Sequence, residues 1–158
     1  MMLLMVGCGL RCAEVASLRV EDLDLDGRRV TVMGKDSRER TVPVSASVAV
    51  ALRRGSWPRS GPAFRGVDGG EYPPYLVSAH VARVLRQSGV DATAHRLRHT
   101  YATALAAAGM PVEQIMVRLG HSSPAMSLRY ARITVRATDL DDQAGVELLG
   151  RGRRLRAV

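Results

Sequence analysis

The sequence has 158 residues, enough for one domain with a hydrophobic core, and 46% of them are hydrophobic. Its net charge of +8 predicts an anionic partner. Aromatic residues make up only 4%, too few for a protein that stacks single-stranded bases, so contact with a duplex backbone is the better expectation. The apolar opening, residues 1–6, is too short to span a membrane and lacks the basic flank of a signal peptide.

Residues 1–6 predict the end of a helix whose beginning is missing, broken at Gly7-Cys8-Gly9. Residues 11–18 predict a second short helix. Cys8 and Cys12 are one helical turn apart, with no CxxC pair and no set of four cysteines. We therefore expect two buried thiols in a reducing cytoplasm, and neither a zinc site nor a disulfide.

Arg11 and Glu14 are three residues apart, so a helix places them on one face. One interpretation is an exposed ion pair, which contributes little to stability. The other is a phosphate-binding arginine held by an acidic neighbour, since the guanidinium fork matches phosphate oxygens.

Valine alternates with polar residues over residues 28–33 and again over residues 40–44, which predicts two strands. Residues 34–38 form the turn of the resulting hairpin. This turn carries Lys35, the only lysine among the 23 basic residues. Without further information a turn lysine is most simply a solvated one.

Residues 45–54 predict a helix with Ser45 or Ser47 as its N-cap. Residues 55–75 are rich in Gly and Pro and predict a long loop, with one short strand near Ala63-Phe64. Residues 76–87 predict a further helix, on which His80 and Arg83 share a face that either contacts a phosphate or is solvated. The predicted contacts to the DNA backbone are Arg38, Arg40, His80 and Arg83.

The stretch AHRLRHTYATALAAAGM predicts a helix that Gly109 ends. His95 and Arg98 are three apart and share a face, while Leu97, Tyr101 and Leu105 recur every four residues on another face, the expected core side. Residues 112–119 predict another helix that ends at Gly120.

Three aspartates, Asp139, Asp141 and Asp142, crowd the start of a predicted final helix, where the helix dipole favours anions. Leu148 and Leu149 belong to its apolar side. From Arg151 the chain is basic and is expected to be disordered.

Three segments together resemble the tyrosine recombinase (phage-type integrase) family. HRLRHT, then LGHS, then Tyr130 nine residues after His121 resemble the active-site half of its catalytic domain. GLRCAEVASLRVEDLDL resembles the segment with the first catalytic arginine, and GKDSRERTVPV resembles a β-hairpin whose lysine reaches the scissile phosphate. The resemblance implies a mainly α fold with a small antiparallel β-sheet.

The resemblance also implies a domain organisation. Residues 1–149 would form the catalytic domain, with its first helix cut short and without the N-terminal core-binding domain that the family usually carries. Residues 150–158 would form a basic tail.

The family resemblance assigns roles to individual residues. Tyr130 would attack a DNA phosphodiester and form a 3′-phosphotyrosyl link, without metal or cofactor. The implied catalytic residues are Arg11, Lys35, His95, Arg98, His121 and Tyr130, with Glu14 and His99 in support. The arginines and His121 would hold the phosphate, His95 would act as acid or base, and Lys35 would protonate the leaving oxygen.

Other classes of function stay open at this point. The chain could be a non-catalytic duplex-DNA-binding remnant of an integrase, or an enzyme like a type IB topoisomerase, which shares the chemistry. A metal site at His95, His99 and His121 is disfavoured, because arginines beside His95 would repel a cation. The expected partner is double-stranded DNA, on which the chain would form a tetramer. No nucleotide cofactor is expected, since no GxxxxGK[ST] loop is present.

Overall fold

The computed structural model describes residues 1–34, 39–67, 69–120 and 139–154, with residues 149–154 as backbone only. The described part is mainly helical with one three-stranded antiparallel sheet, which confirms the predicted fold class. Within it, no helix is both long enough and apolar enough to cross a membrane.

The N-terminal segment forms helix α1 (Met2–Cys8) and the short helix α2 (Cys12–Ala16). Helix α1 continues through Gly7 and ends at Gly9, whose φ of 65° is a left-handed conformation that glycine adopts at low cost. Helix α2 ends two residues earlier than predicted. Of the two predicted buried thiols, only Cys8 is buried, because Cys12 lies at the start of α2 and is half-exposed.

The sheet contains β1 (Leu23–Asp24), β2 (Arg29–Met33) and β3 (Glu39–Pro43) in that order. Strand β1 follows a 3₁₀ turn (Val20–Asp22) and is too short for its alternation to be recognised in the sequence. The hairpin of β2 and β3 confirms the two predicted strands. Residues 63–64 form no strand, since this loop makes only isolated bridges on either side of them.

The remaining helices are α3 (Ala46–Arg53), α4 (Pro74–Gln87), α5 (Ala94–Ala107), α6 (Val112–Leu119) and α8 (Asp139–Arg154). The hydroxyl of Ser45 accepts a hydrogen bond from the backbone N–H of Val48, which confirms Ser45 as the N-cap of α3. Helix α8 runs to Arg154, so the first residues of the expected disordered tail are helical.

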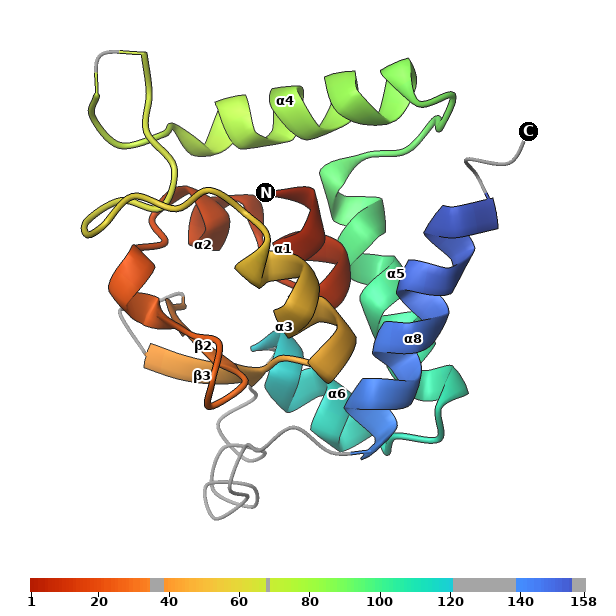
Figure 1. Cartoon of the computed structure of the whole chain (residues 1–158). Helices are drawn as coiled ribbons and strands as arrows, with labels where there is room; N and C mark the ends of the chain where they lie inside the picture. Colours follow the sequence, from red (N-terminus) through yellow and green to blue (C-terminus); the bar gives the residue numbers. More distant parts are fainter. Residues whose placement is uncertain (35–38, 68, 121–138, 155–158) are drawn as a thin grey trace.

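Two hydrophobic clusters form the core, and helix α5 passes from one to the other. Ala94 and Leu97 pack with the cluster built by α1, the sheet, α3 and α4. Tyr101 and Leu105 pack with the cluster built by α5, α6 and α8. Figure 1 shows α8 running alongside α5, and α4 crossing the side of the domain where α2 lies. Arg98 therefore stands where the two clusters meet.

The aspartates at the start of α8 make specific contacts that the helix-dipole argument did not predict. Both oxygens of Asp141 accept from Arg118 of α6, at 3.0 Å from Nε and 3.0 Å from Nη2, and both side chains are buried. Asp142 accepts from Arg28 and from the backbone N–H of Ala46, each at 2.7 Å. These two carboxylates join α8 to α6, to the start of β2 and to the N-terminus of α3.

Candidate active site

Arg11 and Glu14 are joined by two hydrogen bonds at the start of helix α2, one from the backbone and one from the guanidinium. The backbone N–H of Arg11 donates to Oε2 of Glu14 at 2.7 Å, and Nη1 of Arg11 donates to Oε1 at 2.9 Å. The Glu14 side chain is only 3% exposed, whereas that of Arg11 is 36% exposed. The pair is therefore no ordinary surface ion pair, because its carboxylate lies inside the protein while its guanidinium reaches the surface.

Arg98 is the most enclosed cation of the site, with a side chain 7% exposed. Its two Nη groups donate to the backbone carbonyls of Gly9 and Leu119, at the C-terminal ends of α1 and α6. Nη1 also lies 3.9 Å from Oε2 of Glu14. Helix C-termini carry partial negative charge, so these carbonyls stabilise a buried cation.

The structure separates Arg98 from His95, although sequence spacing predicted a shared face. Arg98 is buried on the same side of α5 as Tyr101 and Leu105, which follow it three and seven residues later. His95 is exposed at the first turn of the helix.

Arg40 also belongs to this centre. Its Nη1 and Nη2 donate to Oε1 and Oε2 of Glu14 at 3.0 and 3.1 Å, and its side chain is 14% exposed. The sequence predicted a DNA contact for Arg40, whereas the structure turns its guanidinium inward. The reason is the strand register: Arg40 pairs with buried Val32 and shares a face of β3 with buried Val42.

Three guanidinium groups thus surround one carboxylate, which leaves an excess of positive charge in a partly buried place. Burial, reinforced by the charge of Arg11, lowers the pKa of Arg98 to about 10. Burial also lowers the pKa of Arg40. Both shifts show the cost of keeping these cations away from water, and an anion such as a phosphate would relieve it.

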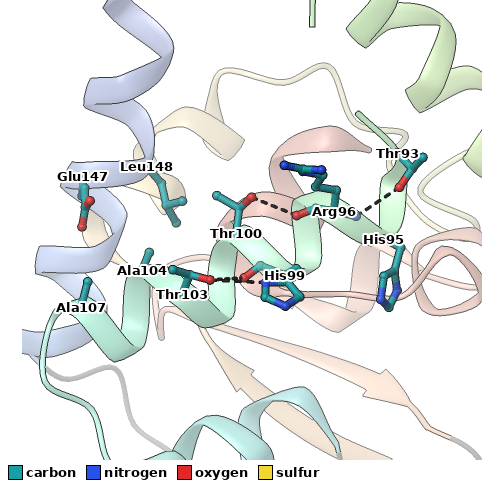
Figure 2. Close-up of a pocket in the computed structure, with 10 residues that line it drawn as sticks. All are labelled: Thr93, His95, Arg96, His99, Thr100, Thr103, Ala104, Ala107, Glu147 and Leu148. Atoms are coloured by element: carbon teal, nitrogen blue, oxygen red, sulfur yellow. Dashed lines mark hydrogen bonds between the residues drawn. The ribbon is translucent and has the colours of Figure 1, made fainter. Parts of the chain in front are cut away.

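His95 and His99 project to one side of α5 and line a cavity of about 530 Å³ between α5 and α8 (Figure 2). Nδ1 of His99 lies 3.4 Å from Oγ1 of Thr103. The full lining consists of Thr93, His95, Arg96, His99, Thr100, Thr103, Ala104, Ala107, Glu147 and Leu148. His95 thus lies one helical turn from Arg98 but on an exposed side of α5, where a ligand can reach it.

The other predicted site residues fall into two groups. His80 and Arg83 contact each other on α4, with Nη2 of Arg83 3.3 Å from Nδ1 of His80, and Arg83 is exposed. Lys35, Arg38, His121 and Tyr130 lie outside the described residues. Among the residues that are described, no three His, Cys, Asp or Glu side chains form a group that could hold a metal ion.

A family model described as "Phage integrase family" matches residues 1–136. The chain belongs to the phage integrase family. Among the relatives of this integrase-family chain is the tyrosine recombinase XerC of Myxococcus xanthus, 35% identical over 83% of this chain and 48% of the relative. The tyrosine recombinase XerA of Thermococcus kodakarensis is 32% identical over 84% of this chain and 50% of the relative.

Solved structures agree with this family. An integrase from mycobacterium phage Brujita superposes with a TM-score of 0.73 and 32% identity, over 94% of this chain and 50% of that one. A XerA recombinase, 21% identical, shares the fold with a TM-score of 0.65 over 95% of this chain and 56% of that one. The chain spans about half the length of the curated relatives it matches.

Sequence reasoning missed two parts of this integrase-family centre, and the sequence does contain a signal for each. Arg40, Val42 and Val44 alternate, so the period of two that predicts the strand also turns Arg40 inward. Gly9 and Gly120 follow the two helices whose carbonyls hold Arg98, and both have the positive φ of helix C-caps, 65° and 64°.

Proposed function

We propose that this chain is the catalytic half of a site-specific DNA recombinase, which cuts and rejoins duplex DNA through a 3′-phosphotyrosyl intermediate. The observation that carries the proposal is that Arg11 and Arg98 lie against the same carboxylate, that of Glu14. Arg11 reaches the surface at this place, where a phosphate could approach it. Membership of the phage integrase family supports it. The named relatives are recombinases, which does not favour a non-catalytic remnant or a topoisomerase.

In the proposed reaction the hydroxyl of Tyr130 attacks phosphorus, the phosphorus–O5′ bond breaks, and a 5′-hydroxyl leaves. Arg11 and Arg98 hold the non-bridging oxygens, on which negative charge develops, and His121 donates a further hydrogen bond. His95 takes the proton of Tyr130, and Lys35 gives a proton to the leaving oxygen. Attack by a second 5′-hydroxyl on the phosphotyrosine reverses these steps and restores the tyrosine.

The geometry of the two arginines suits this role. Arg98 is held by backbone carbonyls at two helix ends, so its position is fixed before the substrate arrives. Fixed donors aimed at a developing charge lower the barrier because they need no reorganisation during the reaction. The net charge of +8 would attract the DNA backbone.

We further propose that the protein works in the cytoplasm on double-stranded DNA as a tetramer, with no metal or nucleotide cofactor. One structural neighbour, the XerH site-specific recombinase, was solved bound to its difH substrate. For this chain we expect weak duplex binding with a steep loss of affinity at higher salt, since phosphate contacts release counterions.

The test uses a pool of nicked duplexes with a randomised central segment, because nicking allows the cut fragment to diffuse away and traps the adduct. Protein–DNA adducts are separated on a denaturing gel and their DNA is sequenced. The expected result is an adduct from the wild type that persists in a chelator and is lost in Tyr130→Phe. An adduct that survives Tyr130→Phe contradicts the assignment, and binding without any adduct indicates a non-catalytic DNA-binding module.

A further inference from the structure

We propose that Arg40 is a positioning residue: it neutralises Glu14, so that Arg11 and Arg98 keep their donors for a phosphate. This inference rests on the proposed function, whose phosphate-binding arginines it concerns. It assigns Arg40 a role inside the site, in place of a contact with the DNA backbone.

The contacts of Glu14 show why a dedicated counter-ion is needed. Its carboxylate is buried and would be costly to leave without a full charge partner. Arg11 gives it one Nη group, and the Nη groups of Arg98 donate to two carbonyls. Of the residues that the structure describes, Arg40 alone places both Nη groups on Glu14, one on each oxygen.

Packing holds Arg40 in this orientation. A Cβ atom at Gly120 would lie 2.7 Å from Nε and 3.0 Å from Cδ of Arg40, so a side chain at position 120 would displace Arg40 from its present place. Its Nε is buried and has no hydrogen-bond partner in the described part of the chain. Among the described residues, the hydrogen bonds that hold the guanidinium are therefore the two of the fork to Glu14.

Without Arg40, the other two arginines would have to neutralise the Glu14 carboxylate. Nη2 of Arg11 now makes only a long contact of 3.3 Å to the carbonyl of Gly120, and could turn to Glu14. Nη1 of Arg98 is already 3.9 Å from Oε2 and could close that gap by leaving Gly9. Each movement would draw a donor inward, away from the surface that Arg11 reaches.

The first test measures phosphate binding directly, so that it stands apart from catalysis. Inorganic phosphate is titrated into the protein, and the side-chain Nε–H NMR signals of Arg11 and Arg98 are followed. We expect Arg40→Gln to weaken binding on the order of tenfold, the scale of one lost charge-assisted hydrogen bond. In Arg40→Gln/Glu14→Gln the carboxylate charge is gone, so we expect affinity within a few-fold of wild type.

The second test compares cleavage with DNA binding on the nicked duplex pool. We expect Arg40→Gln to slow cleavage by roughly 10²-fold, as for one lost donor to a developing oxyanion. The affinity for duplex should fall by no more than the tenfold expected for phosphate, and Glu14→Gln should restore both the affinity and its salt slope. A direct contact of Arg40 with the DNA backbone would instead lower the slope by about 0.9 whether or not Glu14 is charged. Addition of Glu14→Gln should restore most of the cleavage rate.

The matched control is Arg29→Gln on the neighbouring strand, which removes an arginine that is 59% exposed and paired with Asp24. It should leave cleavage and phosphate binding unchanged. Melting curves verify folding. If Arg40→Gln does not fold, Arg40→Lys is measured instead: it keeps the charge but not the fork, so a smaller, few-fold loss of phosphate affinity is expected, and Glu14→Gln should reverse it.

Two results would overturn the proposal. One is an unchanged phosphate affinity in Arg40→Gln, and the other is a loss that Glu14→Gln does not reverse. The second result, if weaker DNA binding and a lower salt slope accompany it, would show that Arg40 contacts the DNA backbone instead. If the phosphate results hold but wild type forms no adduct with DNA, the positioning role stands and the proposed recombinase activity fails.

Discussion

Arg98 is a buried arginine whose two terminal nitrogens donate to main-chain carbonyls and whose only carboxylate contact in the described structure is a distant one. A cation fixed by neutral dipoles keeps its full charge for a ligand, whereas a close carboxylate would compensate it. A lysine cannot reproduce this arrangement, because its single nitrogen cannot face two carbonyls on separate helices and a phosphate in a planar fork.

We therefore predict that Arg98→Lys binds duplex DNA within a few-fold of wild type and cleaves it roughly 10²–10³-fold more slowly. Single-turnover cleavage and equilibrium binding on the same nicked duplexes measure the two quantities. Equal losses in both would mean that Arg98 is only a docking contact. Circular dichroism ensures that the comparison is made between folded proteins.

At the scale of single residues, the sequence predicted which residues lie in the centre better than it predicted which way their side chains face. Arg11, Glu14 and Arg98 were recognisable from spacing and from motif resemblance, and the structure brings them together. For Arg40 the sequence predicted a contact with DNA, which requires an outward-facing side chain. The alternation of strand β3 turns Arg40 inward, but its partner there, the buried Glu14, is far away in the sequence, and a local pattern cannot reveal such a partner.

Gly9 after α1 and Gly109 after α5 each follow the end of a helix, but they are under different packing constraints. Gly9 has a φ of 65°, and a Cβ there would lie 2.4 Å from Cδ1 of Tyr101. Gly109 follows α5 with a φ of 88° and nothing within 4 Å of its Cβ position. Both glycines have a left-handed backbone conformation that would strain any other residue, and they differ in packing.

Gly109→Ala should thus lose about 1–2 kcal/mol of unfolding free energy, the cost of a left-handed alanine. Gly9→Ala should lose that amount plus about 1–3 kcal/mol for overpacking against the tyrosine ring. Urea denaturation of both variants measures the difference. Equal losses would show that Tyr101 moves aside freely.

The ion pair of Arg118 and Asp141 connects α6 to α8 inside the core. Removing one partner leaves a buried charge, so Arg118→Met or Asp141→Leu alone should cost about 3–5 kcal/mol. The double variant should cost much less than the sum, because two apolar side chains can replace a buried pair. The exposed pair of Arg53 and Asp26 is the control, with an expected loss below about 1 kcal/mol.

For the molecule as a whole, the two cysteines provide a probe of cooperative opening. Burial raises the pKa of Cys8 to about 12, and partial burial raises that of Cys12. Alkylation requires the thiolate, so near neutral pH Cys12 should react first and Cys8 only when the domain unfolds. Mass spectrometry during labelling, with and without urea, gives both rates. Rapid labelling of Cys8 in native conditions would contradict a single cooperative core.

The fold class of the whole domain could be predicted from the sequence, whereas the ends of individual helices and strands could be predicted less well. Periodicity identified the strands of the hairpin and the helices over residues 46–53 and 112–119. It missed β1, which exists only because β2 offers a free edge, and it ended the last helix too early, at a basic run. Both errors have one cause, since neighbours in space decided the conformation of these short or polar segments.

The carbonyls that hold Arg98 have a consequence for how the site can change over evolution. Every amino acid has the same carbonyl, so the side chain of residue 119 can vary without altering what Arg98 binds. The length of each helix, in contrast, is constrained. One residue inserted into α1 or α6 would rotate the terminal carbonyl by about 100°, because a helix has 3.6 residues per turn. Substitutions along these helices are thus compatible with the site, whereas insertions and deletions would misalign the arginine even if every functional side chain were kept.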